Sequence, residues 1–257
     1  MNLNISYWDS LADWFDRRQG DEGDLWHRAL INPTVVRVLG PVHGQQVLDL
    51  ACGNGALARQ LARAGARVTG VDASSRLVTL AQRREAANPM GISYHVSDAT
   101  RLAVLRDASV DAVVCNMGLM DIADAEAAIQ EVSRVLKPNG RFVASIVHPC
   151  FDQGSGSAWV VEKSGHITSV WRKVGHYRAL SEGVAVWNIG PGQVSSTPHY
   201  HRPLSWYFRA FKAAGFVVTG LEEPEPTQEF LDNDSEGQWI QEIPLHCVFE
   251  AWKVERA

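Results

Sequence analysis

The sequence predicts an α/β fold built on a mostly parallel sheet whose two faces are covered by helices. Between residues 46 and 147, short apolar segments typical of buried strands alternate with segments typical of helices, which is the pattern of βαβ units. The aromatic residues avoid this region: all nine tryptophans lie before residue 40 or after residue 150, and Tyr94 is the only aromatic residue between Gly40 and Arg141. We therefore expect an aliphatic core with an aromatic periphery.

The first 40 residues predict a helical cap. Apolar residues recur at the i, i+3, i+4, i+7 spacing of an amphipathic helix, at Trp8, Leu11, Ala12 and Phe15. A second helix is expected from about Asp24. Asn32 followed by Pro33 is typical of an N-cap with proline at the first helical position, so a third helix is expected to begin there and to run through Leu39.

The central region predicts five strands and three helices. The strands are expected at 47–50, 67–71, 92–96, 110–116 and 141–147. The helices are expected at 55–64, 74–86 and 124–136, with a turn at 137–140. The apolar strands are short and lack polar alternation, which is typical of strands that are buried on both faces of a sheet.

The remainder predicts a lid and a closing strand pair. Residues 148–203 are rich in glycine and tryptophan, and short strands are expected within 166–174 and 183–189. A structureless loop of this length would be unusual, so we expect a partly β lid. A helix at 203–214 precedes strands at 215–224 and 244–254, and no long helix fits the loop between these strands. We expect a single domain over residues 1–257, divided into a cap (1–40), a cofactor-binding core (41–147), a substrate lid (148–203) and a closing segment (204–257).

Composition narrows the function classes. The net charge of −5 argues against a general affinity for nucleic acid, which requires a basic face. The four cysteines are scattered without a C-x-x-C pair, so neither a disulfide framework nor a structural zinc site is expected. The N-terminus has no signal pattern, and no apolar run approaches the length of a membrane span. We expect a cytoplasmic protein that does not enter a membrane.

The stretch "VLDLACGNGALAR", residues 47–59, joins a strand to a helix through two glycines. Backbone N–H groups and a helix N-terminus at such a joint attract an anion. Two ligand classes use it: the pyrophosphate of a dinucleotide, and the amino-acid end of S-adenosylmethionine. The G-x-G-x-x-A spacing alone fits a dinucleotide. However, Asp49 at the strand end would repel a pyrophosphate and suits a cation, and Asp72 and Asp98 end or follow two more strands.

These motifs resemble those of the class I S-adenosylmethionine-dependent methyltransferases. The matching segments are "VLDLACGNG", "VTGVDAS", "VSDAT", "VDAVVCNMGLMDI" and "RVLKPNGRFV", in the family's order, and the last strand pair resembles its closing β-hairpin. Ala51 departs from the pattern, because the family commonly has glycine there. The resemblance implies a doubly wound, Rossmann-like sheet of seven strands with a terminal antiparallel hairpin, and S-adenosylmethionine as cofactor.

The resemblance also implies roles for individual residues. The glycine-containing joint would hold the methionine portion of the cofactor, Asp72 the ribose, and Asp98 the adenine, while Asn116 would lie beside the sulfonium. An N-terminal aromatic residue, Tyr7 or Trp14, would close over the cofactor, although each could equally be a core residue. The full implied set is Asp49, Ala51, Cys52, Gly53, Asn54, Gly55, Asp72, Ala73, Asp98, Ala99, Asn116, Met117, Tyr7 and Trp14.

Methyl transfer to a hydroxyl also requires a base. His148 follows the fifth strand at the edge where ligands bind, and it is our candidate general base, with a structural strand-end role as the alternative. Tyr200 and His201 could line the same pocket, or form a buried turn. Asp121, after the fourth strand, is a weaker candidate for the base, and helix capping is its better interpretation. His199 and His201 have metal-ligand spacing but lack a third ligand, so no metal site is expected.

The sequence therefore predicts methyl transfer by in-line displacement to an O or N atom of a small-molecule acceptor. Pro149-Cys150 leaves open a nucleic-acid interpretation, in which an RNA or tRNA methyltransferase uses a cysteine after the fifth strand. An NAD-type dehydrogenase and a non-catalytic module that binds the cofactor also remain open. Neither the identity of the acceptor nor an oligomeric state follows from the sequence.

Overall fold

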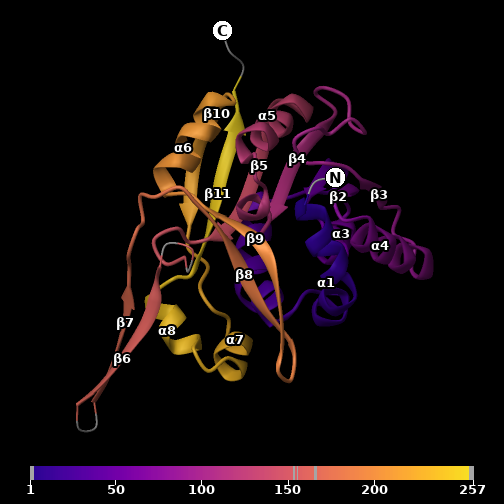
Figure 1. Cartoon of the computed structure of the whole chain (residues 1–257). Helices are drawn as coiled ribbons and strands as arrows, with labels where there is room; N and C mark the ends of the chain where they lie inside the picture. The colour runs from indigo at the N-terminus through magenta and orange to yellow at the C-terminus, as the bar shows by residue number, and fades with distance from the viewer. Residues whose placement is uncertain (1–2, 153, 155, 165–166, 255–257) are drawn as a thin grey trace.

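A seven-stranded sheet organises the chain (Figure 1). The computed structural model describes residues 3–152, 154, 156–164 and 167–254. The sheet has the order β10-β11-β5-β4-β1-β2-β3, and β11 is antiparallel to both of its neighbours. Its strands are β1 (Gln46–Leu50), β2 (Arg67–Asp72), β3 (Ser93–Val96), β4 (Val110–Asn116), β5 (Leu136–Val147), β10 (Phe216–Glu222) and β11 (His246–Lys253). The predicted fold class, with its terminal hairpin, is confirmed.

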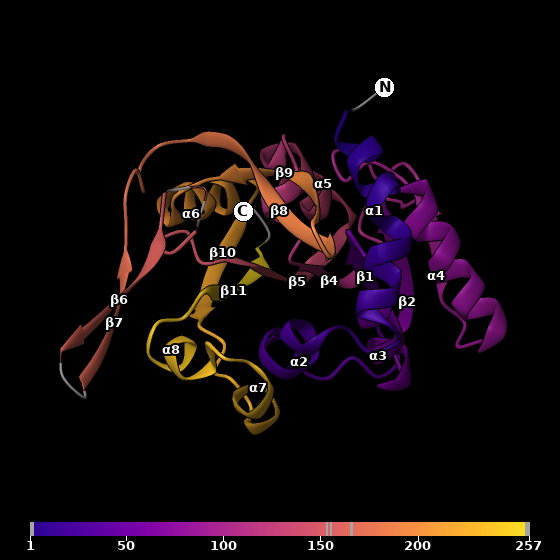
Figure 2. The same cartoon turned by 60° about the horizontal axis from the view of Figure 1, so that its bottom comes forward.

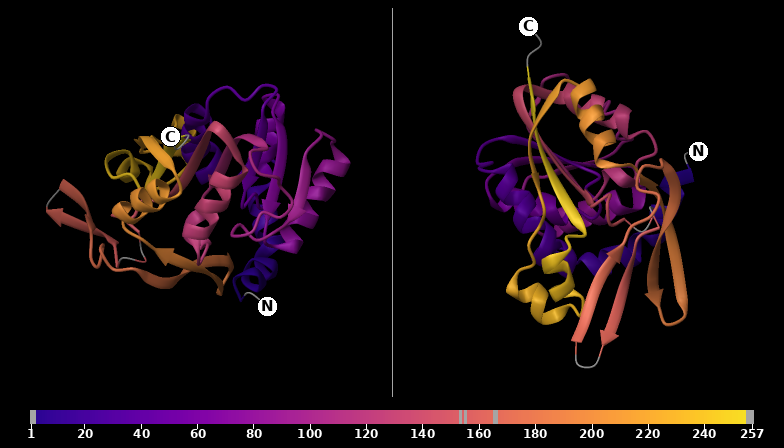
Figure 3. Two further views of the ribbon diagram at one scale, coloured as in Figure 1. Left: turned by 90° about the horizontal axis from the view of Figure 1, so that it is seen from above. Right: turned by 90° about the vertical axis from the view of Figure 1, so that its left-hand side faces the viewer.

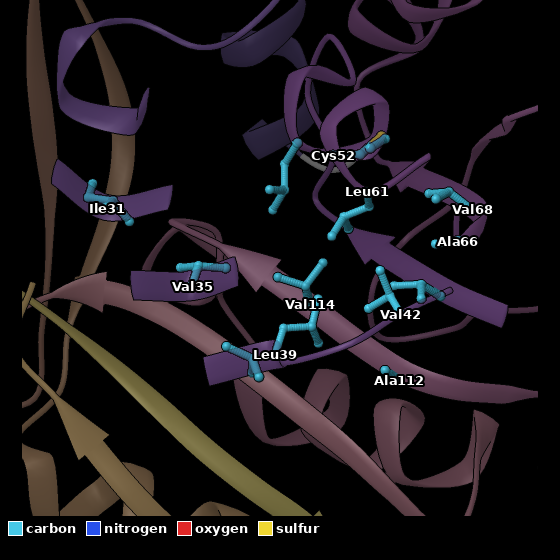
Figure 4. Close-up of a cluster of buried hydrophobic side chains, with 14 of the residues drawn as sticks. Ile31, Val35, Leu39, Val42, Cys52, Leu61, Ala66, Val68, Ala112 and Val114 are labelled. Atoms are coloured by element: carbon cyan, nitrogen blue, oxygen red, sulfur yellow. The ribbon is translucent and has the colours of Figure 1, made fainter. Parts of the chain in front are cut away.

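Helices cover both faces of the sheet (Figure 3). Successive residues of β4 point to opposite faces, so Ala112 and Val114 pack in one apolar cluster while Val113 and Cys115 pack in the other. Figure 4 shows part of the first cluster, which includes side chains of α2 (Asn32–Leu39), α3 (Ala56–Arg63) and α4 (Ser75–Ala87). The second cluster includes α5 (Ala125–Val135) and α6 (Leu204–Ala213).

Two helix starts that the sequence indicated are fixed by side-chain caps. The hydroxyl of Ser74 accepts a hydrogen bond from the Leu77 N–H at 3.1 Å and begins α4. The carboxylate of Asp124 accepts one from the Ala127 N–H at 2.9 Å and begins α5. Each cap satisfies an N–H that has no partner within its own helix. Asp124, rather than Asp121, is therefore the cap of α5, and the predicted capping role of Asp121 is wrong.

The expected N-cap at Asn32 is also wrong. Helix α1 (Leu3–Gln19) is followed by a π-helical turn, η1 (His27–Ile31), which runs directly into α2, and Asn32 has helical backbone angles. Pro33 has no N–H to give to the carbonyl of Ala29 four residues earlier. Thr227 supplies the missing donors, because its N–H and hydroxyl lie 3.1 and 2.8 Å from that carbonyl. The hydrogen bonds from Thr227, which is distant in sequence, thus allow the helix to continue where the sequence predicted a break.

The lid consists of two β-hairpins, of which the sequence predicted one strand each. The first pairs β6 (Ala158–Ser164) with β7 (Ile167–Lys173), and the second pairs β8 (Ser181–Gly190) with β9 (Gln193–His201). The predicted strand at 166–174 begins at residue 166, which lies outside the described residues. The β8–β9 hairpin reaches α1, which also lies along α4 (Figure 2). There Trp187 contacts Trp8 and Trp14, with ring centroids 5.9 and 5.8 Å apart.

The loop between β10 and β11 contains two short helices, α7 (Gln228–Asn233) and α8 (Gly237–Glu242). No long helix was expected there, and each of the two has only six residues. Helix α7 packs through Phe230 on Trp26, with ring centroids 5.1 Å apart. The loop therefore packs against the N-terminal cap (Figure 2). Among the helices that the structure describes, none has both the length and the apolar character that a bilayer crossing requires.

Candidate active site

A cavity of about 720 Å³ opens at the carboxyl edge of β1, β2 and β4. One part of its lining comes from strand ends and includes Ala51, Asp72 and Asn116. Another part comes from the lid and the start of β11, and includes Phe151 and His199. Ligands of open α/β sheets bind at this edge, and the volume lies within the range of small-molecule sites.

The glycine joint between β1 and α3 borders the cavity through Ala51 and Gly53. Ala51, Gly53 and Gly55 all have left-handed backbone angles, with φ of 58°, 55° and 79°. The N–H of Gly53 donates to Asp72 Oδ2 at 2.8 Å, and a Cβ on Gly53 would lie 3.2 Å from the ring of Phe15. Gly55 does not line the cavity; a Cβ there would collide with the ring of Tyr94. Gly53 therefore shapes the site, whereas Gly55 is required by core packing.

Asp49 is a buried acid beneath this joint. It is 1% exposed, and its Oδ2 atom has no hydrogen-bond partner among the described residues. Burial first, and the neighbouring Asp72 second, raise the pKa of Asp49 to about 7. It borders a side cavity of about 50 Å³, which Cys52, Gly53 and Asn54 also line. A buried carboxylate without a partner is costly, so this position suits a cationic group such as an ammonium.

The two remaining strand-end acids line the large cavity. Asp72 Oδ1 accepts from the Ser74 N–H at 2.8 Å, and burial raises the pKa of Asp72. Asp98 Oδ1 accepts from the N–H and the hydroxyl of Thr100, both at 2.8 Å. Ala73 and Ala99 follow these acids in the lining. The structure thus brings the predicted acids of β2 and β3 to one surface.

Asn116 and Met117, after β4, are held by a buried hydrogen-bond network. Asn116 Nδ2 donates to Asn32 Oδ1 at 2.8 Å, and Asn116 Oδ1 accepts from the Ser145 hydroxyl at 2.6 Å. Ser145 Oγ in turn accepts from the Met117 N–H at 2.9 Å. Met117 has a φ of 57°, an uncommon conformation for this residue type. Asn32, the first residue of α2, is therefore hydrogen-bonded to Asn116 at the carboxyl end of β4.

The aromatic residues that α1 contributes to the cavity are not the predicted ones. Tyr7 is 42% exposed, and neither Tyr7 nor Trp14 belongs to the lining. Trp8 and Phe15 line it instead. One residue turns the side chain by about 100° around a helix, so a neighbouring position lies on a different face. The i, i+7 spacing places Trp8 and Phe15 on one face of the helix, and this spacing could have identified them as the aromatic residues that line the cavity.

His148 lies beside the cavity but not in its lining. Its Nδ1 accepts from the Cys150 N–H at 3.2 Å, and its Nε2 lies 3.3 Å from Glu223 Oε1. Burial lowers the pKa of His148, and Glu223 offsets part of that effect. Both ring nitrogens thus face protein groups. Burial also raises the pKa of the Cys150 thiol, which lies outside the lining as well.

The acid–base group that lines the cavity is Asp121, His199 and Asp152, a combination that no sequence motif indicated. Asp152 Oδ2 lies 2.8 Å from His199 Nε2, and His199 Nδ1 lies 3.8 Å from Asp121 Oδ1. Burial alone would lower the pKa of His199, but the two nearby carboxylates outweigh burial and raise it to about 9. Burial raises the pKa of Asp121, and His199 opposes this only in part.

Tyr200 and His201 flank this group without lining the cavity. His201 Nδ1 donates to Asp152 Oδ2 at 3.0 Å, and its Nε2 donates to the Tyr177 carbonyl at 2.9 Å. The Tyr200 hydroxyl lies 3.5 Å from Glu182 Oε1. Among the described residues, no group of three or more histidine, cysteine, aspartate or glutamate side chains has the geometry of a metal site.

Comparison with known proteins identifies a methyltransferase domain within the chain. Residues 48–144 match the model of a methyltransferase domain. A ubiquinone/menaquinone biosynthesis C-methyltransferase from Rubrivivax gelatinosus is 38% identical over 119 residues, which are 46% of this chain and 44% of that protein. A ubiquinone biosynthesis O-methyltransferase from Albidiferax ferrireducens is 36% identical over 132 residues, 49% of this chain and 50% of that protein. The chain thus matches half or less of the length of these curated relatives.

Similarity to solved structures extends over most of the chain. A structure from Listeria monocytogenes, described as a putative S-adenosylmethionine dependent methyltransferase, is 28% identical with a TM-score of 0.70, and the match covers 90% of this chain and 97% of that one. A methyltransferase structure from Mesorhizobium loti shares the fold, with a TM-score of 0.70 at 24% identity over 86% of this chain and 96% of that one. Residues 48–144 thus form a methyltransferase domain, and the strand order and strand-end acids of the chain are similar to those of S-adenosylmethionine-dependent methyltransferases.

Proposed function

We propose that the chain transfers a methyl group to an O or N atom of a small-molecule acceptor by in-line displacement. The observation that carries this proposal is a single cavity lined both by the strand-end acids and by the Asp121–His199–Asp152 group. Bound S-adenosylmethionine would supply an electrophilic methyl group on a sulfonium. The protein's part is then to hold the acceptor in line and to manage its proton.

The residues that would hold the cofactor fit its charge. Asp49 lacks a partner for Oδ2 and suits the ammonium of the methionine portion. Asp72 keeps its carboxylate at the cavity surface for ribose hydroxyls, and Asp98 lies in the same lining for the adenine amino group. Asn116 and Met117, fixed by the Asn32 and Ser145 network, would lie beside the sulfonium.

Proton transfer and charge stabilisation at the acceptor are the proposed roles of Asp121 and His199. With a pKa of about 9, His199 is protonated at neutral pH and is not the base. It can instead stabilise the negative oxygen of an acceptor hydroxyl that is losing its proton. Asp121, whose pKa is raised by burial, lines the same cavity and takes that proton. Asp152 holds His199 in place.

Features of the site weigh against a dehydrogenase and against a nucleobase methyltransferase. A buried acid under the glycine joint disfavours the pyrophosphate of NAD. Methylation of a nucleobase through Cys150 requires a reactive thiolate in the cavity, but this thiol has a raised pKa and lies outside the lining. The names of the curated relatives indicate ring compounds of ubiquinone and menaquinone biosynthesis as the first acceptors to test.

The cofactor assignment is tested by thermal shift with S-adenosylmethionine, S-adenosylhomocysteine and NAD. A ligand at 100 times its Kd adds about 2.7 kcal/mol to the free energy of unfolding, which for a chain of 257 residues means a Tm increase of roughly 5–10 °C. We expect this shift with both adenosyl ligands and none with NAD. A shift with NAD alone would contradict the proposal and favour the dehydrogenase.

The acid–base assignment is tested with two matched variants. His199→Gln and His148→Gln each replace a buried histidine that faces a carboxylate, but only the first lines the cavity. With radiolabelled methyl donor and a panel of phenol, quinol and amine acceptors, we expect His199→Gln to reduce O-methylation by about 10²-fold or more. His148→Gln should retain most of it. The reverse pattern would restore His148 as the base and remove Asp121 and His199 from the chemistry.

A further inference from the structure

His246 is a buried histidine in the cavity lining that the proposed chemistry does not use. It is the first residue of β11, where it lies opposite Val147 of β5, and it is 8% exposed. Its Nδ1 atom is enclosed and has no hydrogen-bond partner among the described residues. Leaving a buried polar nitrogen unpaired costs about 1–3 kcal/mol, so a core role alone does not account for a histidine at this position.

The ring offers a neutral hydrogen-bonding atom to the cavity. Burial first, then the neighbouring His27 and His148, lower the pKa of His246 to about 3, while Asp24 opposes this only weakly. A neutral imidazole has one N–H donor and one acceptor nitrogen. Because Nδ1 is enclosed, Nε2 is the nitrogen available to a ligand, and a buried N–H without a partner would be the costlier tautomer. Nε2 therefore carries the proton and acts as donor.

Apolar side chains adjoin His246 in the cavity lining. Trp26 contacts the imidazole edge-on, with ring centroids 5.5 Å apart, and Ile31, Val147 and Leu245 also line the cavity. The nearest charged side chains are already paired: Asp24 Oδ1 lies 2.7 Å from His27 Nδ1, and Asp24 Oδ2 accepts from Arg18 Nε at 2.6 Å. An anionic or cationic acceptor group would thus find no unpaired counter-charge among these residues, whereas a neutral ring fits.

His246 lies on the β11 side of the cavity, whereas the strand-end acids lie on its β1 and β2 side. In the strand order, β11 lies three strands from β1 and two from β4, or roughly 14 and 10 Å at about 4.8 Å per strand. The ionisable neighbours of His246 are His27, His148 and Asp24, whereas those of His199 are Asp121 and Asp152. An acceptor that reaches the methyl group beside β4 can therefore contact His246 with a different atom.

We propose that Nε2–H of His246 recognises a second polar atom on an uncharged, planar acceptor, an oxygen or nitrogen other than the atom that receives the methyl group. This inference rests on the proposed function and adds the class of acceptor: a ring with two heteroatom substituents. His246 is then a specificity residue, and Trp26 packs against the ring of the acceptor.

Two amide variants separate the two ring nitrogens. In His246→Gln the amide nitrogen can reach the position of Nε2, whereas in His246→Asn it reaches only that of Nδ1. The probes are phenol and aniline, with one heteroatom, against the three dihydroxybenzenes and the three aminophenols. The wild type should prefer the best two-heteroatom probe by at least about 10-fold in kcat/KM, because a site built to bond a substituent rejects the analogue that lacks it.

The expected result is a KM increase of about 10-fold for the best two-heteroatom probe in His246→Asn, with a smaller increase in His246→Gln and no change for phenol or aniline. The Kd for S-adenosylhomocysteine should be unchanged in both variants. Equal losses on one- and two-heteroatom probes, equal behaviour of the two variants, or a weakened cofactor Kd would overturn the inference.

A second readout does not depend on turnover or on the variants folding. In wild-type protein labelled with ¹⁵N-histidine, the Nε2 resonance of His246 should report a protonated Nε2 in a neutral ring and should shift on addition of a two-heteroatom probe but not of phenol. No shift with any of these probes would overturn the inference. If the chain fails to bind S-adenosylmethionine, the proposed function fails, and the ring shift still decides whether His246 contacts such a compound.

Discussion

Replacing Asp152 by asparagine should destabilise the protein in a pH-dependent way. The substitution keeps the size of the side chain but removes the charge 2.8 Å from His199 Nε2 and 3.0 Å from His201 Nδ1. The pKa of His199 is raised from 6.5 to about 9, and at about 1.36 kcal/mol per unit this corresponds to about 3 kcal/mol. The lowered pKa of Asp152 reflects the same interaction and is not added.

The sign follows from the raised pKa. Stabilisation by His199 is complete below pH 6.5 and is lost as the pH rises through about 9. Asp121 also raises this pKa and stays in the variant, so at about pH 6 Asp152→Asn should lose up to about 3 kcal/mol, or at most roughly 6–12 °C in Tm for a chain of this size. At about pH 10 the imidazole is neutral, and the loss should shrink to that of a neutral hydrogen bond, about 1 kcal/mol.

Urea unfolding at these two pH values, with an NMR titration of the His199 ring, measures both quantities. Asp107→Asn is the control, because it removes an exposed partner of Arg134, and such surface pairs contribute little. An equal loss of stability at the two pH values, or a His199 pKa that stays near 9 in Asp152→Asn, would refute the reasoning.

Three further predictions have defined outcomes, one of them with a control substitution. Asp49→Asn should raise the Kd for S-adenosylmethionine by about 10-fold or more, since a charged hydrogen bond contributes about 1.5–3 kcal/mol. The affinity of the wild type should increase as the pH rises through about 7, the pKa of Asp49. Calorimetry should find no such increase in the variant. Gly55→Ala should lower the free energy of unfolding by about 2–5 kcal/mol, because of backbone strain and collision with Tyr94. The control Gly44→Ala meets no neighbour and should lower it by only about 1–2 kcal/mol. Urea unfolding measures both values. Thr227→Val should cost about 1–3 kcal/mol, because it removes both the hydroxyl bond to the Ala29 carbonyl and the α7 N-cap bond from the Phe230 N–H, and an unchanged denaturation midpoint would contradict this.

The parts of the fold that depend on local patterns were predictable. Strands β1 and β4 are short apolar runs, and Ser74 and Asp124 are caps that lie close in sequence to the N–H groups they satisfy. The predicted turn at 137–140 is wrong, because these residues belong to β5, which begins at Leu136. The acids at the ends of β1 and β2 came together because parallel strands end at one sheet edge. Local periodicity and sheet geometry were sufficient for these elements.

The features that could not be predicted from the sequence depend on distant contacts. The helix continues through Asn32 because Thr227 supplies donors to Ala29, and no local signal announces this. The acid–base group joins Asp121 after β4 to Asp152 and His199 in the lid, and the fold of that lid is set by hairpin pairing rather than by a motif. His148 had the expected position in sequence, but its ring points to Glu223.

A ribosome makes Ala29 long before it makes Thr227. The two residues are 198 positions apart, so at about 5–20 residues per second the Ala29 carbonyl waits roughly 10–40 s for its partner. Strands β1 to β5 can pair during that time, whereas the π-helical turn is still incomplete and His246 has not been synthesised. The strand-end acids emerge first, then Asp121, the lid and finally His246. His246 is therefore the last residue of the cavity lining to be made, although its aromatic neighbour Trp26 is among the first.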